Sequence, residues 1–151
     1  MNVSLEALKK LREETSAGVS DCRKALEEAG GDREEAKKLL LARGLEKASK
    51  KEGKVTHEGI IEAYVHAGKV GVLVDLRSET DFVARTDEFR ALAHEIALQI
   101  AAMNPKTIEE LLESAYIRDP SVSISALIKF SIAKVGENIT VAKFSRLAIG
   151  D

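Results

Sequence analysis

The feature that most constrains the fold is a change in the spacing of apolar residues near residue 60. Before that point, apolar side chains recur every three or four residues, as on one face of an α-helix. From Ile60 to Leu76 they recur at alternate positions, as on one face of a β-strand, and beyond residue 87 the helical spacing returns. Helices and strands in this order must bury their apolar faces against one another, so the sequence predicts an α+β fold.

Three short helices are predicted before the change of spacing. We predict them over residues 4–14, 19–29 and 32–43. Asp32 and Glu35 form a capping-box pattern that begins the third helix, and Gly44 is expected to follow its end. The connections between these segments are short, so we expect a three-helix module over residues 1–44.

Residues 45–58 are predicted to form a Lys-rich helical linker. Lys47, Lys50, Lys51 and Lys54 alternate with acidic residues there, and the apolar periodicity is weak. Two interpretations stay open at this stage, a solvated face and a weak electrostatic contact with an acidic partner.

Residues 59–151 are predicted to form an α+β core domain. Two strands, separated by a Gly-containing turn at Ala67–Lys69, form a hairpin. The later elements are a helix over 87–103 capped by Thr86, a short helix over 108–114, a loop around 116–120, a helix over 123–135 and a strand over 139–147. We expect a three-stranded antiparallel sheet with one face covered by helices.

The connection between the second strand and the long helix has two interpretations. It contains Thr80, Asp81 and Phe82, between two rigid elements that would aim it at a partner. The pattern alone favours the other interpretation, in which Phe82 is a core residue where the strand runs into the helix.

Charge and hydropathy restrict the classes of partner. The chain has 23 basic and 25 acidic residues, a net charge of -2, and few aromatic residues. It lacks the basic field and the stacking surface that nucleic-acid binding needs, so we expect no direct nucleic-acid partner. No apolar run approaches the length of a membrane span and no signal segment follows Met1, which predicts a cytoplasmic protein with no membrane partner.

The residues that catalysis would need do not form a recognisable set. A single cysteine, Cys22, leaves no internal disulfide and no cysteine-based zinc site. His57, His66 and His94 match no metal motif, and no Gly-rich loop fits a phosphate-binding fingerprint. We therefore expect no enzyme and no cofactor or metal, with an active site assembled from distant residues as the open alternative.

Three segments resemble the elongation factor Ts family. Residues 11–26, LREETSAGVSDCRKAL, are similar to the N-terminal signature of that family. Residues 79–85, ETDFVAR, match its second signature, and residues 133–139, AKVGENI, match a segment near the end of its core. The segments follow one another in the family's order and extend over nearly the whole chain.

The resemblance implies a fold, a partner and a set of contact residues. The fold would be a ubiquitin-associated-like (UBA-like) three-helix module followed by a core domain of the dimerisation type. The activity would be guanine-nucleotide exchange on elongation factor Tu, which the chain would bind in its GDP-bound and nucleotide-free states. Asp81 and Phe82 would insert near the nucleotide and magnesium site of that partner. The further contacts implied are Arg12, Val19, Ser20, Arg23, His66, Thr80, Val83, Ile117 and Arg118.

The chain departs from the family pattern in sequence and in length. Ser16 replaces a Gly, and Val19 and Ser20 replace two Met residues, so the contact there should be smaller and less apolar. The repeated core and coiled-coil insertion of longer relatives are absent between Met103 and Ile124. Short relatives can pair two copies, and Ser145 stands where some have a bridging cysteine, so any homodimer of this chain is expected to be noncovalent. The alternative function is a binding module in which the three helices recognise a ubiquitin-like or nascent-chain partner.

Overall fold

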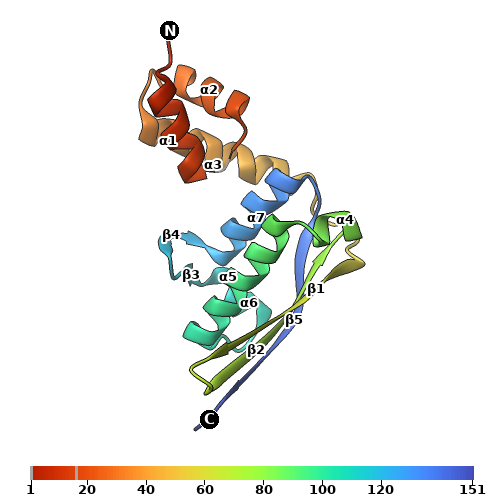
Figure 1. Cartoon of the computed structure of the whole chain (residues 1–151). Helices are drawn as coiled ribbons and strands as arrows, with labels where there is room; N and C mark the ends of the chain where they lie inside the picture. The colour runs from red at the N-terminus through yellow and green to blue at the C-terminus, as the bar shows by residue number, and fades with distance from the viewer. Residues whose placement is uncertain (1, 16) are drawn as a thin grey trace.

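The computed structural model describes residues 2–15 and 17–151, and Ser16 lies outside the described residues. Figure 1 shows three N-terminal helices beside a body that contains the sheet. The N-terminal helices are α1 (Leu5–Thr15), α2 (Val19–Glu28) and α3 (Arg33–Ser49). The body contains β1 (Glu58–His66), β2 (Val70–Ser78), α4 (Asp81–Ala84), α5 (Asp87–Met103), α6 (Ile108–Glu113), β3 (Ala115–Tyr116), β4 (Asp119–Ser123), α7 (Ile124–Val135) and β5 (Ile139–Ala148). The predicted α+β class is confirmed.

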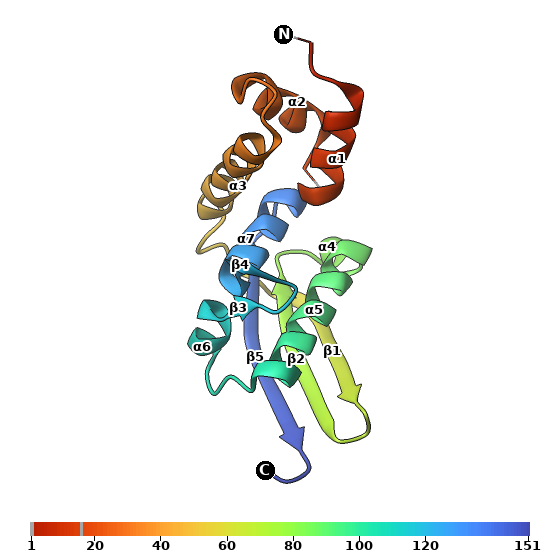
Figure 2. The same ribbon diagram turned by 90° about the vertical axis from the view of Figure 1, so that its left-hand side faces the viewer.

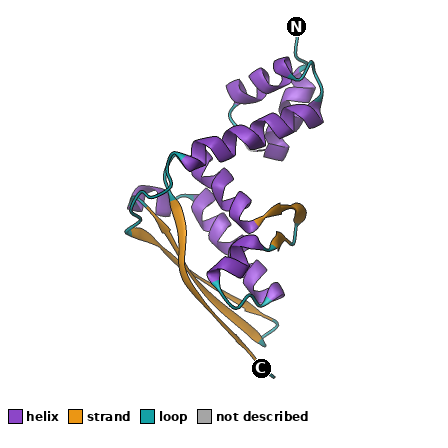
Figure 3. Ribbon diagram, turned by 180° about the vertical axis from the view of Figure 1, so that it is seen from behind, coloured by secondary structure: helices purple, strands orange, loops and turns teal. Residues whose placement is uncertain are grey.

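The three long strands form one antiparallel sheet in the order β1–β2–β5. The predicted hairpin is confirmed, with residues 67–69 joining β1 to β2. β5 pairs with β2 on the other side, where Leu73 lies opposite Ser145. Helices α5, α6 and α7 lie on one side of this sheet in Figures 1 and 3. Within the described chain no element covers the other side, which carries exposed apolar residues such as Leu73.

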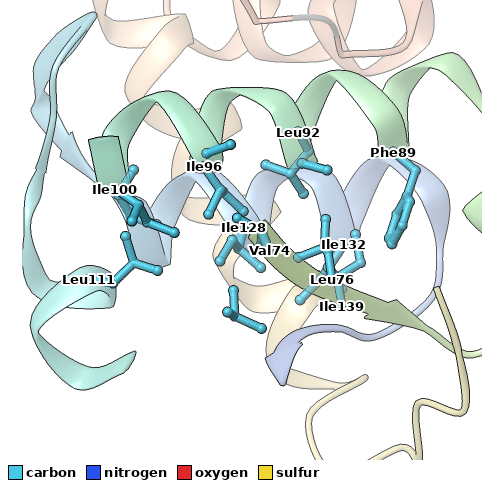
Figure 4. Close-up of a cluster of buried hydrophobic side chains, with 14 of the residues drawn as sticks. Val74, Leu76, Phe89, Leu92, Ile96, Ile100, Leu111, Ile128, Ile132 and Ile139 are labelled. Carbon is cyan, nitrogen blue, oxygen red and sulfur yellow. The ribbon is translucent and has the colours of Figure 1, made fainter. Parts of the chain in front are cut away.

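The main core lies between the sheet and the helices α5 and α7. Alternate residues of β2 face the helices, and residues of α5 spaced by three or four face the sheet, as the two periodicities require. Figure 4 labels Val74, Leu76, Phe89, Leu92, Ile96, Ile100, Leu111, Ile128, Ile132 and Ile139 in this core. Phe89 is only 1% exposed, and the burial of such side chains is the dominant stabilising term.

Helix caps set the limits of the two long helices of the body. Thr86 and Ser123 each accept a hydrogen bond, through the side-chain oxygen, from the backbone N–H three residues further along. Asn104 ends α5 with φ of 49°, and Gly136 ends α7 with φ of 77°. Both residues are in the left-handed conformation that ends many helices. The predicted cap at Thr86 is therefore confirmed.

The third helix is longer than predicted. α3 continues through Gly44, so the expectation that Gly44 follows its end is wrong, and part of the predicted linker over 45–58 belongs to this helix. Its first half places Leu40 in the core of the N-terminal helices, and its second half places Ala48 in the main core. A Cβ on Gly44 would lie 3.3 Å from a ring carbon of Phe130 in α7. Packing on α7 therefore offsets the roughly 1 kcal/mol that Gly costs inside a helix.

Two short elements lie where connections were expected. The segment around residues 116–120 forms the hairpin β3–β4, in which Ala115 pairs with Ser123, instead of an irregular loop. Residues 81–84 form the single helical turn α4. Neither segment is long enough to show a repeating apolar pattern, so periodicity could not reveal it.

Candidate partner-binding site

The turn α4 presents Phe82 to solvent. Thr80 begins the turn, since its hydroxyl accepts a hydrogen bond from Val83 N at 3.3 Å. Val83 and Ala84 are buried, with 6% and 3% of their surface exposed, whereas Phe82 is 76% exposed. Successive helical residues differ in direction by about 100°, so burying Val83 and Ala84 directs Asp81 and Phe82 outward. The interpretation of Phe82 as a core residue is therefore wrong.

Val83 differs from the rest of the predicted group at this turn. Its side chain belongs to the main core, so it anchors α4 within the chain instead of facing outward. Asp81 is exposed, and its Oδ2 lies 2.5 Å from Nη2 of Arg85. An exposed ion pair of this kind contributes little to stability. The carboxylate of Asp81 is therefore free to exchange Arg85 for another partner at small cost.

The four candidate residues of the N-terminal helices lie on either side of the connection between α1 and α2. Arg12 lies in the last turn of α1, and Val19, Ser20 and Arg23 lie in the first half of α2. All four are exposed, Val19 by 42%. They form a second group of exposed side chains, made of two Arg, one small apolar and one hydroxyl residue.

The remaining candidates line one cavity. His66, Ile117 and Arg118, from β1 and the β3–β4 turn, contribute to a cavity of about 360 Å³. Its other lining residues are Tyr64, Val70, Leu98, Ala101 and Ala102. The structure therefore brings together three residues that are far apart in the sequence, at the end of β1 and beside the second half of α5.

Hydrogen bonds fix the β3–β4 side of the cavity. Gln99, fully buried in α5, accepts from Ile117 N at 3.0 Å and donates to Ala115 O at 2.8 Å. Oε2 of Glu95 accepts from Tyr116 Oη and lies 2.7 Å from Arg118 Nε. Burial, followed by the hydrogen bond to Glu95, raises the pKa of Tyr116 to about 12. The turn that carries Ile117 and Arg118 is thus tied to α5 through side chains.

The three groups lie in different parts of the molecule. α4 lies at the end of the body nearest the N-terminal helices, and the β1–β2 turn lies at the opposite end, near the C-terminus (Figures 1 and 2). α5 runs between them, and Asp87 and Leu98 are separated by about 16 Å along its axis at 1.5 Å per residue. A partner that contacted α4 and the cavity together would have to extend along α5.

Three residues that support the site were missed. Gln99, Glu95 and Glu137 had no role in the sequence interpretation, although Glu137 accepts two hydrogen bonds from Thr80. The only signal for Glu137 was its place in the AKVGENI segment, and for Gln99 an amide on the inward face of a helix. Their partners are 15 or more residues away, and apolar spacing carries no information about such contacts.

The other reactive side chains offer little additional chemistry. Cys22 is fully buried among the N-terminal helices, where a thiol is usually inert. Among residues 2–15 and 17–151, no three or more His, Cys, Asp or Glu are grouped so that they could hold a metal ion. In the same residues, no helix has both the length and the apolar character needed to cross a membrane.

Comparison with known proteins assigns the family. A family model described as elongation factor TS matches residues 79–151, which include α4. Elongation factor Ts of Coprothermobacter proteolyticus is 42% identical to this chain over the whole of both proteins. The corresponding protein of Thermotoga petrophila is 42% identical over the whole of this chain and 98% of its own length. That of Thermoanaerobacter sp. (strain X514) is 40% identical over 99% of this chain and 96% of its own.

The chain belongs to the elongation factor Ts family. Membership makes it a translation elongation factor. The match with the Coprothermobacter protein spans 197 residues, whereas this chain has 151, so that elongation factor Ts has residues that are missing here. α5 and α6 are joined here by residues 104–107 alone. The prediction that the missing family segment falls between Met103 and Ile124 stays a prediction.

Proposed function

We propose that this elongation factor accelerates GDP release from elongation factor Tu by inserting Asp81 and Phe82 beside the nucleotide and magnesium site of its partner. The observation that carries the proposal is the 76% exposure of Phe82 on a turn anchored in the core by Val83. A large apolar side chain held in water gains free energy only when another surface buries it. A rigid turn also loses little conformational freedom on binding.

The mechanism follows from thermodynamic linkage. A factor that lowers the affinity of its partner for GDP must itself bind the GDP-bound state more weakly than the nucleotide-free state. Phe82 meets this condition if the pocket that receives it opens only after the magnesium and phosphate elements move. Asp81 would leave Arg85 and either accept hydrogen bonds from displaced groups or repel the phosphates.

The other candidate groups would supply affinity on either side of Asp81 and Phe82, which we call the wedge. Arg12, Val19, Ser20 and Arg23 extend from the N-terminal helices, and His66, Ile117 and Arg118 surround the cavity at the end of α5 far from α4. Thr80 would orient the wedge through its cap. Because this surface extends well beyond the N-terminal helices, the alternative of a binding module made of those helices alone has no specific observation in its favour.

The experiment measures release of a fluorescent GDP analogue from elongation factor Tu. We expect the wild-type chain to accelerate release, and Phe82→Ala to reduce the maximal acceleration about 30-fold, since a central aromatic contact contributes about 2 kcal/mol or more. The matched control is Met103→Ala, which removes another exposed apolar side chain, 53% exposed, at the far end of α5. No acceleration by the wild-type chain would contradict the function, and an unchanged rate with Phe82→Ala would contradict only the wedge.

We also propose that two copies pair noncovalently through the uncovered side of the sheet. Strand register places Ile61, Val65, Leu73 and Leu147 on that side, each more than half exposed. A twofold axis would bring these four apolar residues against their counterparts in the second copy, as in most homodimers. Ser145, beside Leu73, lies on the same side, so the contact would contain no disulfide.

A further inference from the structure

Two turns that are 57 or more residues apart in the sequence are joined by side-chain carboxylates. Oε1 and Oε2 of Glu137 accept hydrogen bonds from the backbone N–H and the hydroxyl of Thr80, at 2.9 and 2.7 Å. In return, Oε1 of Glu79 accepts from Asn138 N at 2.8 Å. We call Glu79, Thr80, Glu137 and Asn138 the carboxylate clamp. Figure 1 shows the connection from α7 to β5 passing beside α4, where the clamp lies.

The backbone after α7 places Glu137 for this contact. Gly136 ends α7 in the left-handed conformation, which turns the chain toward α4. Asn138 is 7% exposed and its side-chain amide donates to Lys54 O at 2.8 Å, so the next residue is held as well. Glu137 therefore extends from a turn that is fixed on both sides.

The clamp acts on the capping residue of α4. The Thr80 hydroxyl donates to Glu137 and also accepts from Val83 N, so one oxygen joins the clamp to the helical turn. A helix of four residues is far below the length that is stable by itself in water. Val83 and Ala84 anchor one side of the turn in the core, and the clamp restrains its N-terminal end. Without the clamp, α4 could pivot about Val83 and change the direction of Phe82.

We propose that Glu137 is a positioning residue for Phe82: it holds the cap of α4 in the orientation that points this side chain at a partner. Hydrogen bonds to a charged acceptor are about twice as strong as neutral ones, which suits a residue that must restrain an exposed turn. The consequence for nucleotide exchange depends on the proposed function, whereas the effect on α4 does not.

The first test uses the isolated chain and measures amide hydrogen exchange at Thr80 and Val83. In the wild-type chain, local opening of α4 must break the hydrogen bonds to the Glu137 carboxylate, which adds to its free-energy cost. We expect Glu137→Ala to remove this cost and to speed exchange at both amides about tenfold or more. Glu137→Gln should give a smaller increase, since its carboxamide keeps one acceptor oxygen. Glu109→Gln, at an exposed position in α6, is the control and should leave both amides unchanged. Wild-type exchange at Thr80 and Val83 in a folded Glu137→Ala chain would overturn the inference.

The second test measures GDP release from elongation factor Tu at saturating concentrations of this chain. We expect Glu137→Ala to lower the maximal rate about tenfold in the wild-type background and to have no further effect in a Phe82→Ala background. Equal effects in both backgrounds would show that Glu137 does not act through Phe82. If the wild-type chain does not accelerate release at all, the proposed function fails, and the amide-exchange result alone decides the role of Glu137.

Discussion

At the scale of single residues, Thr80 and Val83 restrain α4 from opposite sides and leave Phe82 in water. Val83 enters the core, while Thr80 bonds to Glu137. Exposing a Phe costs stability that burial would have provided, about 1.5 to 3 kcal/mol for a large apolar side chain. This arrangement is therefore better explained by a contact outside the chain than by folding.

At Gly59, the pairing of β1 with β2 leaves no room for a side chain larger than hydrogen. A Cβ on Gly59 would lie 2.1 Å from Leu76 O, a backbone atom that cannot move without disturbing β2. We expect Gly59→Ala to lower the free energy of unfolding by about 3 kcal/mol, as overpacking does. Gly71→Ala is the matched control, because a Cβ there would meet nothing within 4 Å. Urea denaturation of both variants measures the difference, and equal stabilities would contradict the packing argument.

The raised pKa of Tyr116 predicts how the free energy of unfolding depends on pH in the alkaline range. Burial and Glu95 raise its folded-state pKa to about 12, above the value of 10.0 expected without the fold. The folded chain then holds the proton more tightly, so this contribution to the free energy of unfolding is complete below about pH 10 and disappears as the pH rises toward 12. We expect Tyr116→Phe to be less sensitive to this rise. Urea denaturation across the range tests it, and a constant difference between the two proteins would contradict it.

At the scale of elements, α3 joins the N-terminal helices to the body. Its two halves bury side chains in different cores, Leu40 in one and Ala48 in the other. A continuous helix is stiff, so the exposed residues of α1 and α2 are carried on a rigid support instead of a flexible tether. The candidate residues of α1 and α2 and those of α4 are then held in a constant position relative to each other.

Because α3 packs closely on α7 at Gly44, the stability of the chain should depend on the size of the side chain at this position. We expect Gly44→Leu to force α3 away from Phe130 and to lower the free energy of unfolding by about 2 to 3 kcal/mol. Ala42→Leu adds a similar volume on an exposed side of the same helix and should have little effect. Chemical denaturation compares the two variants. A Gly44→Leu chain as stable as Ala42→Leu would show that close approach to α7 is not required.

At the scale of the whole molecule, the sheet has one covered side and one uncovered side. The covered side is buried under α5 and α7, while the other side presents four large apolar residues to water. Large exposed apolar surfaces on a soluble domain commonly mark an interaction site. Pairing of two copies would bury this surface and leave α4 and the cavity of each copy unchanged.

The pairing can be tested by one charge on the uncovered side. We expect wild-type chains to have the mass of a dimer and Leu73→Glu chains the mass of a monomer, because a desolvated carboxylate opposes association. Val55→Glu places the same charge at another exposed apolar residue and should leave the dimer intact. Analytical ultracentrifugation distinguishes these outcomes, and a monomeric wild-type chain would contradict the proposed pairing.

Most of the secondary structure could be predicted from the sequence. The change of apolar spacing, the turn over residues 67–69 and the cap at Thr86 all depend on residues within a few positions of one another. Gly44 shows the limit of this approach. Local propensity favours a helix end there, and contact with Phe130 overrides it.

The sequence by itself determined the order of the longer helices and strands and, through its signatures, the family to which the chain belongs. Only the tertiary structure decided that Phe82 is exposed while Val83 is buried, that His66 and Ile117 line one cavity, and that Glu137 holds Thr80. The physical reason is the range of the interactions involved. Periodicity and capping act over a few residues, whereas burial and side-chain hydrogen bonds depend on segments that only folding brings together.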